Sequence, residues 1–70
     1  MIMSVVDDAK EVVYDTFGEF SAKKVEAFAE QIDFKAHPKE FIDTCKNFVA
    51  GMLGEKFAME KFKKIYDKYT

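Results

Sequence analysis

Two Gly-Glu steps, Gly18-Glu19 and Gly54-Glu55, constrain this chain more than any other feature. Each step falls where one run of apolar residues at helical spacing stops and the next begins. Glycine accepts a positive backbone φ without a steric penalty, and it commonly follows the last residue of a helix. The two steps therefore predict two helix–Gly-turn–helix hairpins in one chain.

The two halves repeat one apolar pattern. Residues at i, i+3, i+4 and i+7 mark one face of a helix. Before each glycine the pattern is the same at an offset of 36: Val5, Val6, Ala9, Val12, Val13, Thr16 and Phe17, then Phe41, Ile42, Cys45, Phe48, Val49, Met52 and Leu53. After the glycines an offset of 37 aligns Phe20 with Phe57 and Val25 with Phe62. The apolar stripe of the second segment consists of Ala22, Val25, Phe28, Ala29 and Ile32, and that of the fourth segment consists of Ala58, Met59, Phe62, Ile65, Tyr66 and Tyr69.

These segments predict an all-α fold in which two hairpins, related as a pseudo-repeat, pack as a compact four-helix domain. We expect a single domain, residues 1–70, with repeat one at about 4–32, a linker at about 33–37 and repeat two at about 38–69. Ser4 and Asp7 have the spacing of a capping box, and Pro38 suits the first turn of a helix. Shared helical periodicity is the alternative to a true duplication, although periodicity does not require the common Gly-Glu turn followed by Phe.

Size and charge favour association. A chain of 70 residues buries a small core, and its one cysteine excludes an internal disulfide, so good packing or a partner chain must supply stability. Residues 1–34 carry eight acids and three lysines, a net charge of −5, and residues 35–70 carry five acids and eight lysines, a net charge of +3. The two hairpins are thus complementary in charge, whether they pair within one chain or are exchanged between two.

Candidate chemical groups are few. His37 precedes Pro38 with Asp33 and Glu40 nearby, but this trio lacks the spacing of a metal site, and we interpret His37 as a solvated residue. Cys45 falls in the apolar register and is expected to be a small buried hydrophobe instead of a reactive thiol. We therefore expect no metal, no cofactor and no catalytic residues.

Other functions can be weighed on particular residues. Five lysines give the last helix a basic face: Lys56, Lys61, Lys63, Lys64 and Lys68. Because acids interrupt this face and the chain contains no arginine, a solvated surface is favoured over a nucleic-acid site. Acid–base catalysis by carboxylate pairs such as Asp7-Asp8 needs a pocket that perturbs their pKa. A chain of 70 residues with a filled core leaves little room for such a pocket, so we do not expect an enzyme. The Asp-Ser-Leu signature of acyl carriers is absent.

The order of three short motifs resembles a known group of domains. Phe17-Gly18-Glu19, Pro38-Lys39-Glu40-Phe41 and Leu53-Gly54-Glu55 occur in this order, and the last helix closes with Ile65-Tyr66. In this the chain resembles small helical domains of unknown function that are found alone or at the ends of archaeal signalling proteins. The resemblance implies a protein–protein or signal-output role and no catalytic residues. His37 departs from the pattern, which has an acidic residue before the proline.

The sequence thus predicts a small cytoplasmic helical interaction module, signalling-related and self-associating as a homodimer. The cytoplasmic location is expected because the chain lacks a signal-peptide pattern at Met1–Val6 and a long apolar run. Tyr14, Tyr66 and Tyr69 are the candidate interface residues, since tyrosine combines an apolar ring with a polar tip. A small nucleic-acid-binding protein and a small-ligand or metal sensor are the alternatives, and we expect neither a membrane nor a nucleic acid as the partner.

Overall fold

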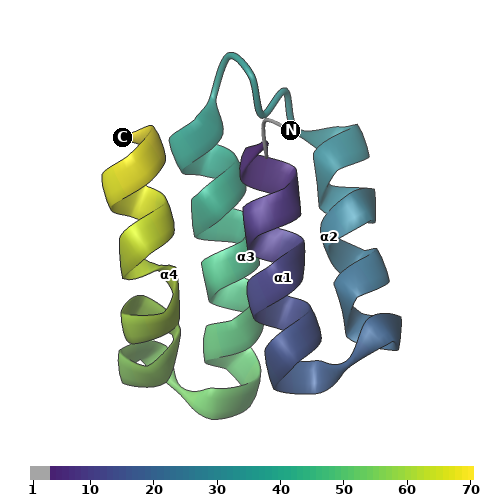
Figure 1. Cartoon of the computed structure of the whole chain (residues 1–70), viewed down its shortest axis with the longest axis vertical. Coiled ribbons are helices and arrows are strands. Elements are labelled where there is room, and N and C mark those ends of the chain that lie inside the picture. The colour runs from purple at the N-terminus through teal and green to yellow at the C-terminus, as the bar shows by residue number, and fades with distance from the viewer. Residues whose placement is uncertain (1–3) are drawn as a thin grey trace.

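The computed structural model describes residues 4–70 and confirms an all-α, four-helix fold. Its elements are α1 (Val5–Phe17), α2 (Glu19–Gln31), α3 (Pro38–Leu53) and α4 (Glu55–Tyr69). Successive helices run in opposite directions (Figure 1), so both Gly turns lie at one end of the bundle, and the linker lies at the other end with the start of α1 and the end of α4. We call these the turn end and the linker end. Helix α1 contacts the other three helices, whereas α2 and α4 do not contact each other within residues 4–70.

Helix α1 begins with the capping box that the sequence predicts. The Ser4 Oγ accepts a hydrogen bond from the Asp7 amide at 3.3 Å, and the Ser4 amide donates to Asp7 Oδ2 at 3.2 Å. Together these bonds satisfy backbone donors that the first turn of a helix leaves without an intrahelical partner.

Each hairpin turns on a single glycine. Gly18 and Gly54 have φ of 94° and 96° and ψ of −176° and 155°. The positive φ agrees with the sequence, but ψ is extended and differs from the left-handed helical value, in a region that only glycine readily adopts. The Gly18 amide donates to the Tyr14 carbonyl at 2.8 Å, and the Gly18 carbonyl accepts from the Ala22 amide at 3.2 Å. One residue thus closes α1 and opens α2, and Gly54 does the same between α3 and α4.

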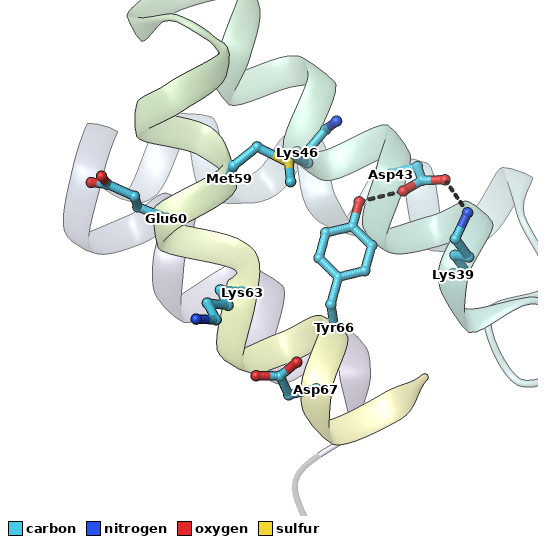
Figure 2. Close-up of a pocket in the computed structure, with 8 residues that line it drawn as sticks. All are labelled: Lys39, Asp43, Lys46, Met59, Glu60, Lys63, Tyr66 and Asp67. Atoms are coloured by element: carbon cyan, nitrogen blue, oxygen red, sulfur yellow. Dashed lines mark hydrogen bonds and ion pairs between the residues drawn. The ribbon is translucent and has the colours of Figure 1, made fainter.

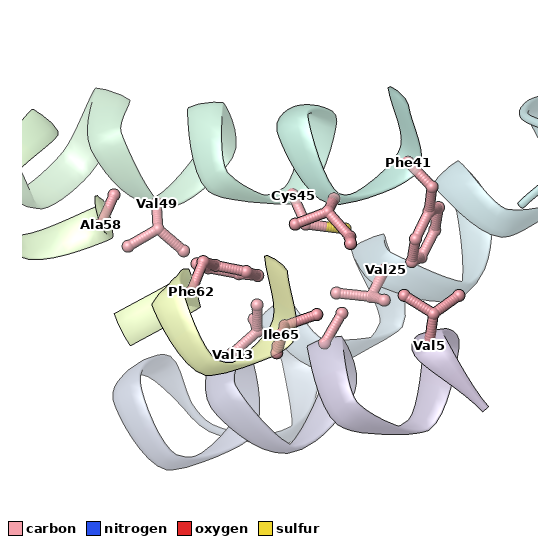
Figure 3. Packing of buried hydrophobic residues seen from close by; sticks show 11 residues of the cluster. Val5, Val13, Val25, Phe41, Cys45, Val49, Ala58, Phe62 and Ile65 are labelled. Atoms are coloured by element: carbon pink, nitrogen blue, oxygen red, sulfur yellow. The ribbon is translucent and has the colours of Figure 1, made fainter. Parts of the chain in front are cut away.

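The core runs through the centre of the bundle and contains no buried polar residue among the residues described. Ala9 on α1 and Cys45 on α3 are both fully buried, at repeat-equivalent positions. The cluster of buried residues (Figure 3) consists of Val5, Ala9, Val13, Val25, Phe41, Ile42, Cys45, Val49, Ala58, Phe62 and Ile65. Phe34, which falls in the predicted linker, also packs against this core, with its ring centroid 5.8 Å from that of Phe41.

Within residues 4–70, ion pairs cross three of the five helix–helix contacts: α1–α2, α3–α4 and α1–α4. Lys10 on α1 pairs with Glu26 on α2 at 2.7 Å. Its repeat equivalent on α3, Lys46, pairs with Glu55 on α4 at 2.8 Å. Across the hairpins, Lys68 Nζ lies 3.0 Å from Asp8 Oδ2, in a groove where three carboxylates of α1 and three lysines of α4 meet: Asp8, Glu11, Asp15, Lys61, Lys64 and Lys68. The acidic and basic halves therefore meet within one chain at the α1–α4 seam.

The sequence alignment of Phe20 with Phe57 is wrong, because the two residues do not occupy equivalent positions in the structure. Phe57 is half-buried against the core, whereas Phe20 is 80% exposed. Ala22 and Ala58 are both buried, each four residues after its glycine, so the offset of 36 continues through the first turn of the second helix. Phe57 therefore corresponds to the half-buried Ser21, and the offset changes only later, because the next buried residues are Val25 and Phe62.

Candidate functional site

Three residues that the sequence places on apolar stripes are exposed. Met52 and Leu53 end α3 with 55% and 47% of their surface exposed, and Met59 on α4 is 48% exposed. The helical register is correct for Met52 and Leu53, but they lie at the turn end, where no further helix covers the core. Together with Phe20 and Tyr14 they are the large apolar side chains on the surface of residues 4–70. Periodicity could have identified Phe20, because it falls outside the α2 stripe.

The three tyrosines chosen as interface candidates differ in their surroundings. Tyr14 is 55% exposed on α1, in a shallow depression that it shares with Lys10, Glu19, Ala22, Lys23 and Glu26. The Tyr66 hydroxyl donates to Asp43 Oδ1 on α3, and the Tyr69 hydroxyl donates to Asp8 Oδ2 on α1 at 2.6 Å. Two of the three polar tips thus join helices within the chain, and only Tyr14 projects from the surface.

These tyrosine contacts also change the pKa of the groups involved. Burial, and then the bond to Asp43, raises the pKa of Tyr66; burial and the bond to Asp8 likewise raise the pKa of Tyr69. For Asp8, burial alone would raise the pKa, but hydrogen bonds from Tyr69 and Lys68 outweigh it, and the pKa falls below 3.8. Near neutral pH, Asp8 is therefore ionised and both tyrosines are neutral.

A groove of about 540 Å³ lies between α3 and α4 on the outside of the bundle (Figure 2). Met59 and the ring of Tyr66 contribute apolar surface, and charged residues of both signs surround them: Lys39, Asp43, Lys46, Glu60, Lys63 and Asp67. Lys39 lies 3.7 Å from Asp43, and Lys46 is paired with Glu55. The groove is thus amphipathic but has no excess of one charge that would select an anion or a cation.

The surroundings of Cys45 do not favour a reactive thiol, and those of His37 do not form a metal site. Cys45 is fully buried, and burial raises the pKa of its thiol to about 12, so it is the buried hydrophobe that the sequence predicts. His37 is exposed and immediately precedes Pro38, the first residue of α3. The structure does not bring Asp33 and Glu40 into a cluster with it: Asp33 Oδ1 accepts from the Ala36 amide at 3.2 Å instead.

Two further observations concern metals and membranes. Within residues 4–70, no three side chains of the types that bind metals form a group that could hold an ion. In the same part of the chain, no helix has both the length and the apolar character needed to cross a lipid bilayer.

Comparison with protein-family models, curated proteins and solved structures finds no match to this chain.

Proposed function

We propose that this chain is a small protein–protein interaction module that self-associates and serves a signalling-related role in the cytoplasm. The observation that carries the proposal is the exposure of Phe20, with 80% of its surface in contact with solvent. A phenylalanine at this position contributes nothing to the core, and a polar residue would serve a solvated helix better. Aromatic residues are enriched at protein interfaces relative to the rest of the surface.

The distribution of the other apolar residues supports the same function. The core is closed by eleven clustered residues, so Phe20, Tyr14 and Met52 are not needed to complete it. Aromatic residues and methionine are enriched at the centres of protein interfaces, where they add contact area. The signalling role rests on the resemblance described above, and its location in the cytoplasm on the sequence pattern.

Sedimentation equilibrium of the intact chain from micromolar to hundreds of micromolar tests self-association. We expect the weight-average mass to rise from 8.1 kDa toward twice that value. A mass that stays at the monomer value over the whole range would contradict a self-associating module. The Phe20→Ser variant tests whether the exposed ring of Phe20 contributes to association. It should associate more weakly than the parent chain and should keep the same helical circular dichroism.

A small-ligand sensor is the second candidate, because the α3–α4 groove has the volume of a ligand pocket and an apolar surface at Met59 and Tyr66. Ligand binding there should raise the melting temperature of the chain, and Met59→Lys should abolish that rise. The nucleic-acid alternative has less support, since Lys61, Lys64 and Lys68 of α4 line a groove together with α1 carboxylates.

A further inference from the structure

A second groove follows the seam between α1 and α4. It consists of two adjoining hollows that share three lining residues, one of about 490 Å³ toward the turn end and one of about 260 Å³ toward the linker end. We call it the α1–α4 groove. Its two banks carry opposite charges, with Asp8, Glu11 and Asp15 on α1 and Lys61, Lys64 and Lys68 on α4. Each bank thus has a single sign of charge, whereas both banks of the α3–α4 groove are mixed.

Most of the charges on these banks are not used inside the chain. The three acids and the three lysines each follow the spacing i, i+3 and i+7, so they line one side of their helices and form three facing pairs of opposite charge. The pair at the linker end is closed, because Lys68 contacts Asp8 at 3.0 Å. Within residues 4–70, Glu11, Asp15 and Lys64 form no ion pair or hydrogen bond. These three charges are available to a molecule that enters the groove.

The apolar lining of the groove is most exposed at the turn end. Val12 and Phe57 are half-buried against the core, and Leu53, the last residue of α3, is 47% exposed. Lys61 extends over the Phe57 ring, with its Nζ 5.3 Å from the ring centroid, so the rim stays charged beside this apolar surface. A large apolar side chain placed here would cover surface that the four helices leave in contact with solvent.

We propose that the α1–α4 groove binds an amphipathic helix of a partner protein, with basic side chains along one edge of its apolar stripe and acidic side chains along the other. The basic edge lies over α1, the acidic edge lies over α4, and a large apolar side chain packs on Leu53 and Phe57. Asp8 and Asp15 lie about two turns apart, so a partner helix of about three turns, roughly 11 residues, spans the groove. This inference goes beyond the self-association proposed above, because Phe20 does not line this groove.

A single helix suits the groove better than a second copy of the chain does. In helix-in-groove recognition, the convex apolar stripe of one helix fills a concave apolar surface. A twofold dimer uses the same patch on both subunits, so a second copy would place one groove against another. The two grooves would then enclose empty space, and the side chains that line a void lose their packing contacts.

The apolar and charged parts of the groove have different roles in this binding. Each exposed ion pair contributes little free energy, so apolar contact at Leu53 and Phe57 supplies most of the affinity. The charges determine the direction of the bound helix. Turning the helix end to end would place its basic edge over the lysines of α4 and its acidic edge over the carboxylates of α1, and such like-charge contacts suppress the wrong arrangement.

Fluorescence anisotropy with a labelled, designed peptide tests the groove. The peptide has about 14 residues, with a leucine stripe, lysine along one edge and glutamate along the other. Glu11→Lys combined with Asp15→Lys makes both banks basic, so we expect the dissociation constant to rise at least tenfold. A second peptide, with glutamate along both edges, should bind this variant at least tenfold more tightly than it binds the parent chain.

Two further variants control for charge and for apolar contact. Glu30→Lys combined with Glu60→Lys makes the same change in net charge at exposed sites outside the groove, and binding of the first peptide should stay within twofold of the parent value. Leu53→Ser leaves the charge unchanged and should weaken binding of the first peptide at least fivefold. Circular dichroism melting shows whether each variant folds.

The same variants show which outcome would overturn the proposal. The groove is the wrong site if the parent chain does not bind the first peptide at hundreds of micromolar, or if reversing the acidic bank weakens binding no more than the control does. The variant with both banks basic and a variant with both banks acidic, Lys61→Glu with Lys64→Glu, can also be mixed. If each is a monomer alone and the mixture dimerises, the groove binds a second copy and the partner helix is overturned. Sedimentation of the parent chain tests self-association separately, so either proposal can fail without the other.

Discussion

The Tyr69 hydroxyl donates a 2.6 Å hydrogen bond to Asp8 Oδ2, joining the last turn of α4 to the first turns of α1. Lys68 contacts the same carboxylate oxygen at 3.0 Å. Asp8 is thus the residue on α1 that holds the end of the chain at the linker end of the bundle. Its side chain is only 14% exposed, so water screens these contacts less than it screens the pair of Lys10 with Glu26, in which both side chains are more than a third exposed.

This relationship predicts how stability depends on acid. The folded-state pKa of Asp8 lies below its ordinary value of 3.8, so its contribution is complete above pH 3.8 and is lost as the pH falls through the folded-state pKa. Asp8→Asn should lower the free energy of unfolding at neutral pH by about 1–2 kcal/mol and should weaken its dependence on acid. Urea unfolding from pH 7 to pH 2 measures both effects. Asp67→Asn, at an exposed position, is the control, and an equal loss in that variant would refute the role of Asp8.

The three glycines should respond in opposite ways to one substitution. Gly18→Ala and Gly54→Ala place a Cβ on a backbone with positive φ and should each cost about 1–3 kcal/mol. Gly51→Ala removes a glycine from a helix interior with open space around it and should stabilise the monomer by about 0.5–1 kcal/mol. Thermal melting at low concentration distinguishes these effects from association. Equal melting temperatures for all three variants would show that the turns do not need glycine.

Phe20 and Phe57 provide a second matched pair. Phe57→Ala removes a ring that packs against the core and should cost about 2 kcal/mol. Phe20→Ala removes a ring that is 80% exposed and should change the stability of the monomer by less than about 0.5 kcal/mol. Denaturant unfolding at low concentration measures the difference. Equal losses would mean that Phe20 is buried in solution, against the arrangement described here.

Cys45 should be inert in the folded chain. Its thiol is fully buried and has a pKa of about 12, so almost none of it is thiolate at pH 8. A disulfide reagent that reacts with thiols should therefore modify Cys45 of the native chain only when the chain unfolds. It should modify the urea-unfolded chain at the rate of a free cysteine. Fast modification of the native chain would contradict the burial of Cys45. Cys45→Ala, which matches Ala9 in the repeat, is the reagent blank.

The sequence alone determined the elements of this protein. Helical periodicity and the positions of Ser4, Gly18, Pro38 and Gly54 were enough to predict four helices, because caps and turn glycines act within a few residues of the chain. The burial of Cys45 also followed from its register. These features depend on local backbone geometry and on which face of a helix is apolar.

The packing of the helices determines which apolar residues are buried in the core. Met52 and Leu53 share the apolar register of α3 but are exposed, because the bundle ends before another helix can cover them. Phe20 and Phe57 follow the same Gly-Glu step, yet one projects from α2 and the other packs inward, since the repeat shifts by one residue only after the first turn. The partners of Asp8 lie 60 and 61 residues away in the chain. Such contacts depend on how the helices pack together, which a periodic pattern within each helix does not specify.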